Sequence, residues 1–197
     1  MTDTRDAPAT TKERLLVATL ETIDAVGMQR ATTRLIAEGA EVNLQLIQYH
    51  FGGKDQMVAE AQRYIVDRFF DVVGPALLAH DDLAGALRAG VAATWRLAQE
   101  QPALVQPDLL LQARRAHTAA PGGQDDRATH GRLRGLLTEV MATSGQGLAV
   151  PLDVFVVLVT GGLSGLIEEH RVGVDADTVE AALDAFSELL LGLVVPD

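Results

Sequence analysis

Two short helical segments joined by a tight break constrain the fold of this chain more than any other feature. The residue pattern predicts helices over residues 34–40 and 43–50, with only two residues between them. Helices that cross over so short a turn need a small side chain where they touch, and Ala37 provides it. The apolar residues spaced to form one core beneath the crossing are Ile36, Ala40, Val42 and Ile47. We therefore expect a rigid helix-turn-helix.

The second helix of such a pair can enter the major groove of DNA in a fixed register. Its outward face should present Gln45 and Gln48, whose amides can pair with N6 and N7 of adenine. Leu44 or Leu46 can contact thymine methyl groups. These residue types indicate that the segment reads base edges.

Other side chains of this region are suited to phosphate. Tyr49 and His50 can reach the DNA backbone, and Lys54 begins the next helix, where free backbone donors also favour an anion. From spacing alone, a compact helical corner without any ligand is an equally good interpretation, because short helix pairs are common in all-α proteins.

The rest of the chain is predicted to be helical too. Apolar residues recur at spacings of three and four, which is the period of an amphipathic helix. The further predicted helices are 11–26, 54–73, 83–101, 103–117, 126–143, 151–171 and 176–194. Gly74 and Pro75 are expected to end the helix over 54–73. No segment predicts a strand. The prediction is an all-α fold of about nine helices.

Composition favours a cytoplasmic protein without disulfides. There are no cysteines, which excludes disulfides and thiolate metal sites and favours a reducing compartment. Residues 1–10 are polar and lack the apolar core of a signal peptide, so we interpret them as a disordered tail. The longest uncharged apolar run, residues 154–167, is shorter than the ~20 residues that span a bilayer. No membrane partner is expected.

Charge and motifs bear on the function class. The formal net charge of −11 argues against nucleic acid when taken alone. Residues 12–54 are neutral, however, so the acidity lies elsewhere in the chain. The sequence lacks Glu-x-x-His and His-Glu-x-x-His motifs, a phosphate loop and a dinucleotide fingerprint, so no enzyme, metal or cofactor is expected. An unrecognised helical enzyme and an interaction module with a non-functional helix-turn-helix remain as alternatives.

The helix-turn-helix residues, taken in order, resemble a known family. The segments are TTRLIA at 32–37, VN at 42–43 and IQYHFGGKD at 47–55, after a helix that begins near residue 12. Over residues 12–61 this arrangement is similar to the DNA-binding segment of the TetR family. The resemblance implies a homodimer of nine or ten helices, in which a first helical triad reads DNA and the remaining helices sense a ligand.

The resemblance also implies roles for individual residues. By position, those implied to contact DNA are Thr32, Thr33 and Arg34 on the second helix, Asn43, Leu44, Gln45, Leu46, Gln48 and Tyr49 on the third, and Lys54 on the fourth. Glu41 stands where the family usually has a turn glycine, and Gln48 replaces a usual tyrosine. Leu44 and Leu46 make the reading face more apolar than is usual.

The implied organisation is a tail at 1–10, a DNA-binding domain at 11–53 and a ligand-binding and dimerisation domain at 54–197. Glycines that would let helices approach a partner subunit are Gly161, Gly162 and Gly165, and the apolar stripe expected at the dimer interface is Val179, Leu183, Phe186 and Leu190. Packing within one subunit explains both features equally well.

A ligand pocket is expected among the helices of the second domain. Candidate lining residues are Trp95, Gln112, Met141 and Phe155, although each is more simply explained as core. The composition suits a small apolar molecule. The sequence thus predicts a repressor that a small apolar effector releases from a palindromic DNA operator.

Overall fold

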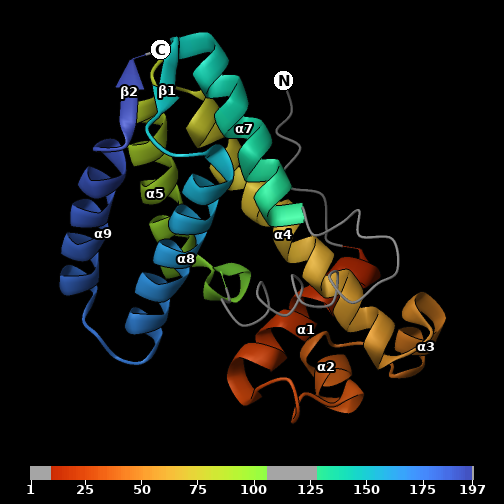
Figure 1. The fold of residues 1–197 in the computed structure, drawn as a ribbon. Coiled ribbons are helices and arrows are strands. Elements are labelled where there is room, and N and C mark those ends of the chain that lie inside the picture. Colours follow the sequence, from red (N-terminus) through yellow and green to blue (C-terminus); the bar gives the residue numbers. More distant parts are fainter. Residues whose placement is uncertain (1–9, 106–127, 197) are drawn as a thin grey trace, which may run out of the picture. The chain divides into compact units, whose positions relative to one another are not determined.

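The computed structural model describes residues 10–105 and 128–196, and they form a chain that is almost entirely helical (Figure 1). The elements are α1 (Thr11–Val26), α2 (Thr33–Gly39), α3 (Gln45–Phe51), α4 (Lys54–Leu78), α5 (Leu83–Glu100), the 3-10 helix η1 (Pro102–Val105), α7 (Ala128–Ser144), β1 (Gln146–Leu148), α8 (Leu152–Arg171), α9 (Ala176–Leu191) and β2 (Val194–Pro196). The prediction of an all-α fold with an N-terminal helix-turn-helix is confirmed.

The chain divides into two compact units, Met1–Tyr64 and Ile65–Asp197. The division falls inside α4, whereas the sequence placed a domain boundary at the start of that helix. The first part of α4 supplies core residues to the first unit, among them Met57 and Ala61, which are almost completely buried. The first unit therefore contains three complete helices and the beginning of the fourth.

Local signals in the sequence set the ends of α1. Thr10 and Glu13 form a capping box, in which Glu13 N donates to Thr10 Oγ1 at 3.2 Å and Thr10 N donates to Glu13 Oε2 at 2.8 Å. Gly27 ends the helix with φ of 79°, a conformation that favours glycine. The helix buries a stripe of Leu15, Leu16, Leu20 and Ile23, which holds it in the core of the first unit.

The core beneath the helix crossing forms as the spacing predicts. Ile36, Ala37 and Ile47 are buried, and the Val42 backbone N–H donates to the Ala37 carbonyl at 3.0 Å across the turn. Among the described residues, Glu41 is the only one other than glycine with a positive φ, at 54°. The left-handed conformation disfavours any L side chain, so this turn carries strain of roughly 1 kcal/mol.

In the second unit, α5, α8 and α9 pack against one another and α7 packs against α5 and α8 (Figure 1). The largest fully buried side chains there include Phe155 on α8, Leu137 and Val140 on α7, and Leu83 and Leu97 on α5. Asp82 caps α5 by accepting from Gly85 N at 2.7 Å. The core of this unit is thus built by helices that lie far apart in the sequence.

Two details of the predicted secondary structure were wrong. α4 does not end at Gly74 and Pro75 but continues through both to Leu78, because burial of Val73 and Leu77 stabilises the added turn despite the missing backbone donor. The segments β1 and β2 pair antiparallel, with Gly147 opposite Val195, although no strand was expected. Where a helix was predicted over 103–117, the described residues form η1, and residues 106–117 lie outside the described part of the chain.

Candidate nucleic-acid interface and ligand cavity

The first unit presents one face of α3 to solvent. Tyr49 is 81% exposed and Leu44 is 49% exposed, and Gln45 and Gln48 are exposed beside them. On the opposite side of the helix, Ile47 and Phe51 are buried in the core, and Leu46 is half-buried. The core therefore fixes which side chains of α3 point outward. They are the residues that the sequence assigned to base reading, with Leu46 the least exposed of them.

The capping of α3 uses one of the predicted DNA-contacting side chains. Asn43 Oδ1 accepts a hydrogen bond from Gln45 N at 2.9 Å, which satisfies a free backbone donor at the start of the helix. The side-chain amide nitrogen of Asn43 remains on the exposed surface. Asn43 thus positions the beginning of α3 and can also donate to a phosphate.

The start of α2 is arranged in a similar way. Thr32 Oγ1 accepts from Leu35 N at 3.2 Å and caps the helix, while Thr33 is half-buried. Arg34 is exposed, and its Nε donates to Glu38 Oε1 at 3.0 Å. Because both partners are exposed, this ion pair is weak. The guanidinium can exchange Glu38 for a phosphate at little cost.

Two predicted phosphate contacts are partly engaged elsewhere. Lys54 is half-buried, and its Nζ donates to the Met28 carbonyl at 3.3 Å. His50 is half-buried and packs edge-on against Tyr49, with ring centroids 5.0 Å apart. An ammonium group has three donors, so Lys54 can hold Met28 and still approach an anion.

A second ion pair stabilises the first unit. Lys12 Nζ lies 2.6 Å from Glu60 Oε2 and 5.5 Å from the centroid of the Phe51 ring. Lys12 donates to the carboxylate and so lowers the pKa of Glu60 below its ordinary value of 4.5. The pair ties α1 to α4, and Lys12 also packs over the last residue of α3.

The second unit encloses a cavity of about 80 Å³. Its lining comes from α4, α5, η1, α7, α8 and α9 and is largely apolar, with Phe69, Val91 and Leu133 as examples. The polar lining groups are hydroxyls, and they belong to Thr94, Thr129, Thr160 and Ser164. No ionisable side chain lines this cavity among the described residues.

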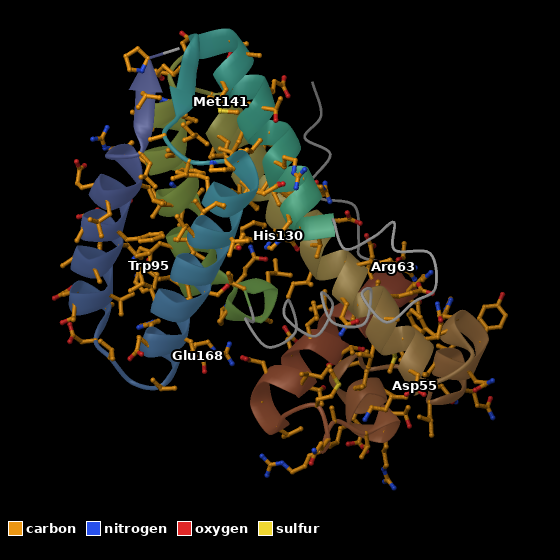
Figure 2. The ribbon with its side chains drawn as sticks, viewed as in Figure 1. Asp55, Arg63, Trp95, His130, Met141 and Glu168 are labelled. Carbon is orange, nitrogen blue, oxygen red and sulfur yellow. The ribbon has the colours of Figure 1, made fainter. Side chains whose placement is uncertain are left out.

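The cavity differs from the sequence prediction in its residues. Phe155 is fully buried in the core, and neither it nor Met141 lines the cavity. Trp95 instead lines a separate surface groove between α5 and α9, and its indole N–H is buried without a hydrogen-bond partner in the described chain. Figure 2 shows Trp95 on α5, and His130 and Met141 on α7. Gln112 lies outside the described residues.

Trp95, Met141 and Phe155 were chosen as pocket markers for their large side chains, and none of them lines this cavity. The walls are mostly ordinary aliphatic residues, which the sequence cannot tell from core. The one usable signal was the pair of hydroxyls at Thr160 and Ser164, which are four residues apart and therefore share a face of an otherwise apolar helix.

The predicted dimer residues of α8 and α9 differ in their exposure. Val179, Leu183 and Leu190 are buried within their own unit, where α9 packs on α5 and α8. A Cβ at Gly162 would overlap the ring of Phe186, so this glycine allows close packing inside one chain. The apolar stripe of α9 is thus satisfied without a partner.

Another apolar face of the same two helices is exposed. On α8 it carries Val154, Val157 and Leu158, and a Cβ at Gly161 or Gly165 would meet no atom within 4 Å. On α9, Leu189 is 73% exposed. Two of the three predicted interface glycines therefore lie on open surface.

The described residues contain no group of three or more His, Asp or Glu side chains that could hold a metal ion. Nor does any helix among them combine the length and apolar character needed to cross a membrane.

The fold and this geometry define a helix-turn-helix protein with a second, mainly helical unit. Residues 15–61 match the family model described as bacterial regulatory proteins, tetR family. This stretch contains the helix-turn-helix, so this part of the chain is similar to that family.

Curated relatives match the same region. The regulator BetI 1 of Chromohalobacter salexigens is 44% identical over 62 residues, which is 32% of this chain and 31% of that protein. BetI of Stenotrophomonas maltophilia is 36% identical over 62 residues, or 32% of each chain. The match thus spans about a third of the length of these relatives.

Solved structures share the fold along nearly the whole chain. A TetR family transcription regulator from Marinobacter aquaeolei VT8 aligns with a TM-score of 0.72 at 16% identity, covering 94% of this chain and 96% of the other. The fatty acid degradation regulator FadR from Bacillus halodurans aligns with a TM-score of 0.72 at 16% identity, covering 94% and 97%. At such identities the likeness concerns the fold alone.

Proposed function

We propose that this chain is a cytoplasmic, ligand-responsive transcriptional repressor that binds a palindromic DNA operator as a homodimer. The observation that carries the proposal is the exposed face of α3, where Leu44, Gln45, Gln48 and Tyr49 project from a helix held rigidly by a buried core. In this proposal, the glutamine amides read adenine, Leu44 contacts thymine methyl groups, and Tyr49 reaches phosphate.

The homodimer follows from the exposed apolar face of α8 and α9. Val154, Val157 and Leu158 on α8 and Leu189 on α9 are large apolar side chains in solvent. A partner copy would remove them from water, and Gly161 and Gly165 would let its helices come close. Two-fold symmetry of the protein then requires an operator with matching two-fold symmetry.

The ligand response uses the cavity of the second unit. A molecule bound there would favour a conformation in which the two reading helices no longer fit their half-sites. A coupling free energy of ~1–3 kcal/mol between ligand and DNA is enough to change occupancy by roughly 5–150-fold. In this scheme α4 transmits the change, because it is the one helix that contributes residues to both units.

The test is fluorescence anisotropy with labelled DNA from immediately upstream of the coding sequence, across a salt series and with excess random DNA. The proposal predicts binding that survives the competitor and weakens linearly in log salt, as phosphate contacts require. Binding no tighter than to random DNA, followed by failure to select any sequence from a random pool, would favour the alternative of an interaction module. The left-handed Glu41 and the acidic Glu38 keep that alternative open.

A further inference from the structure

We propose that the cavity of the second unit takes an uncharged molecule, with an apolar body and one hydrogen-bonding group that docks at Ser164 and Thr160 on α8. That this molecule acts as an effector of DNA binding rests on the proposed function. Binding itself can be measured without DNA.

The size of the cavity limits the molecule. A volume of about 80 Å³ is room for roughly six water molecules, or for a compact organic molecule of on the order of ten non-hydrogen atoms. Most of the wall consists of aliphatic and aromatic side chains, including Leu77, Leu87 and Ile167. An apolar body of that size gains free energy by leaving water for such surroundings.

Two of the four hydroxyls in the wall lie on one face of α8. Thr160 and Ser164 lie one helical turn apart, and His130 on α7 contacts Thr160 with 3.0 Å between Nε2 and Oγ1. Thr160 Oγ1 donates its single proton to the Val156 carbonyl at 2.8 Å or, in the other tautomer of His130, to Nε2 of that ring. Its proton is therefore already committed within the protein.

The Ser164 hydroxyl has no hydrogen-bond partner among the described residues, although it lines the cavity, and the same is true of the Thr129 hydroxyl on α7. A hydroxyl in an apolar setting is destabilised until it is paired. A ligand hydroxyl or carbonyl beside Ser164 would supply that pair, and the remaining lone pair of Thr160 lies on the same face of α8. Because the rest of the wall is mostly apolar, the ligand would lie with its polar end toward these two hydroxyls in the middle of α8.

The wall offers nothing to a charged ligand. No carboxylate, ammonium or guanidinium group lines the cavity among the described residues, so a buried ion would lose its hydration without compensation. Phe70 could attract a cation through its ring, but the Arg132 guanidinium already lies 4.9 Å from its centroid. Arg132 is itself paired with Asp67 at 2.5 Å, so it is not free to attract an anion.

Four probes of equal chain length test the inference: 1-octanol, 1-fluorooctane, octanoate and octylammonium. Their binding to the full chain without DNA is followed by the fluorescence of Trp95, the single tryptophan, which adjoins the lining residue Thr94 on α5. We expect 1-octanol to bind at least about tenfold more tightly than either ion. Ser164→Ala should weaken 1-octanol by about threefold to tenfold and leave 1-fluorooctane unchanged, since only the alcohol can donate to that hydroxyl.

The matched control is Ser144→Ala at the end of α7, away from the cavity lining, which should change neither affinity. Equal or tighter binding of octanoate or octylammonium would overturn the inference, as would no binding by any probe or an equal loss for both neutral probes in Ser164→Ala. Operator binding is measured separately by anisotropy. A protein that binds 1-octanol but no DNA contradicts the proposed function alone, whereas one that binds DNA but not 1-octanol contradicts this inference alone.

Discussion

The two units of this chain hold the groups that we propose for recognition in opposite places. The first unit holds the polar residues proposed to read DNA on the outside of a seven-residue helix, fixed from beneath by Ile47 and Phe51. The second unit encloses its hydroxyls in an apolar cavity whose walls come from six separate elements. An exposed helix face can be exchanged residue by residue without loss of the fold, while a cavity wall is also part of the core.

The largest effect is expected on the exposed face of α3. Replacing both Gln48 and Tyr49 with alanine should abolish operator binding, because each contact is worth about 1–3 kcal/mol and a dimer makes each of them twice. Helicity and dimerisation should not change, since both side chains are exposed. Anisotropy, circular dichroism and sedimentation check the three statements, with Gln99→Ala on the exposed surface of α5 as control. A folded double mutant with undiminished DNA affinity would remove this face from the interface.

Phe155 provides the opposite case in the second unit. It is fully buried, so Phe155→Ala should lower the free energy of unfolding by about 3–5 kcal/mol. Phe69→Ala should cost less than half as much, because Phe69 is only half-buried beside the cavity. Chemical denaturation measures both. A stable Phe155→Ala protein with altered ligand affinity would instead support the role in ligand binding that the sequence indicated.

The exposed apolar face of α8 is a case in which the second unit, like the first, would bind a partner through its surface. Val157→Asp should weaken dimerisation by about 3 kcal/mol or more, since it would place an unpaired charge in the interface. Analytical ultracentrifugation reports the change. Val72→Asp, at an exposed valine of α4, is the control and should leave the dimer intact. If the two variants behave alike, the dimer must form elsewhere.

A smaller effect is expected at the strained turn of the first unit. Glu41 has φ of 54°, so Glu41→Gly should stabilise the unit by about 1 kcal/mol. It should also raise DNA affinity by removing a negative charge between α2 and α3. Glu41→Gln separates the two effects, because it removes the charge and keeps the strained backbone. Its thermal unfolding temperature should stay near that of the parent chain, and its DNA affinity should rise. Equal stability of all three proteins would mean that the turn is not strained.

The smallest effect concerns the pH dependence of the first unit. The pKa of Glu60 is lowered by its hydrogen bond from Lys12, so the carboxylate contributes stability above its ordinary pKa of 4.5. That contribution is lost as the pH falls through the lowered pKa of the folded state. Glu60→Gln should therefore reduce stability by no more than about 1 kcal/mol at pH 7 and by nothing in strong acid. A deficit that persists in acid would indicate a packing defect instead.

The sequence predicted the first unit better than the second for a physical reason. In residues 10–53, caps, turns and core contacts lie within a few positions of one another, as with the Thr10–Glu13 capping box and the Ala37–Val42 bond. Its reading face could therefore be inferred from local spacing. The value of φ at Glu41 also agrees with the departure seen there in the sequence.

In the second unit, the decisive contacts join residues far apart in the chain. The fit of Gly162 against Phe186 and the pairing of β1 with β2 depend on how whole helices pack. Periodicity marked the α9 stripe as buried but could not tell whether the same chain or a partner buries it. The residues that line the cavity were not identified for the same reason, because they are ordinary core residues.

The central claim is that α3 reads a specific DNA sequence as part of a two-fold dimer. The most direct test is repeated selection of binding sites from random double-stranded DNA by the purified chain, with the Gln48→Ala, Tyr49→Ala double mutant in parallel. The account predicts that the parent chain enriches an inverted repeat with A·T pairs in its half-sites, and that the double mutant enriches none. The same sequences recovered by both proteins, or no enrichment by the parent chain, would contradict it.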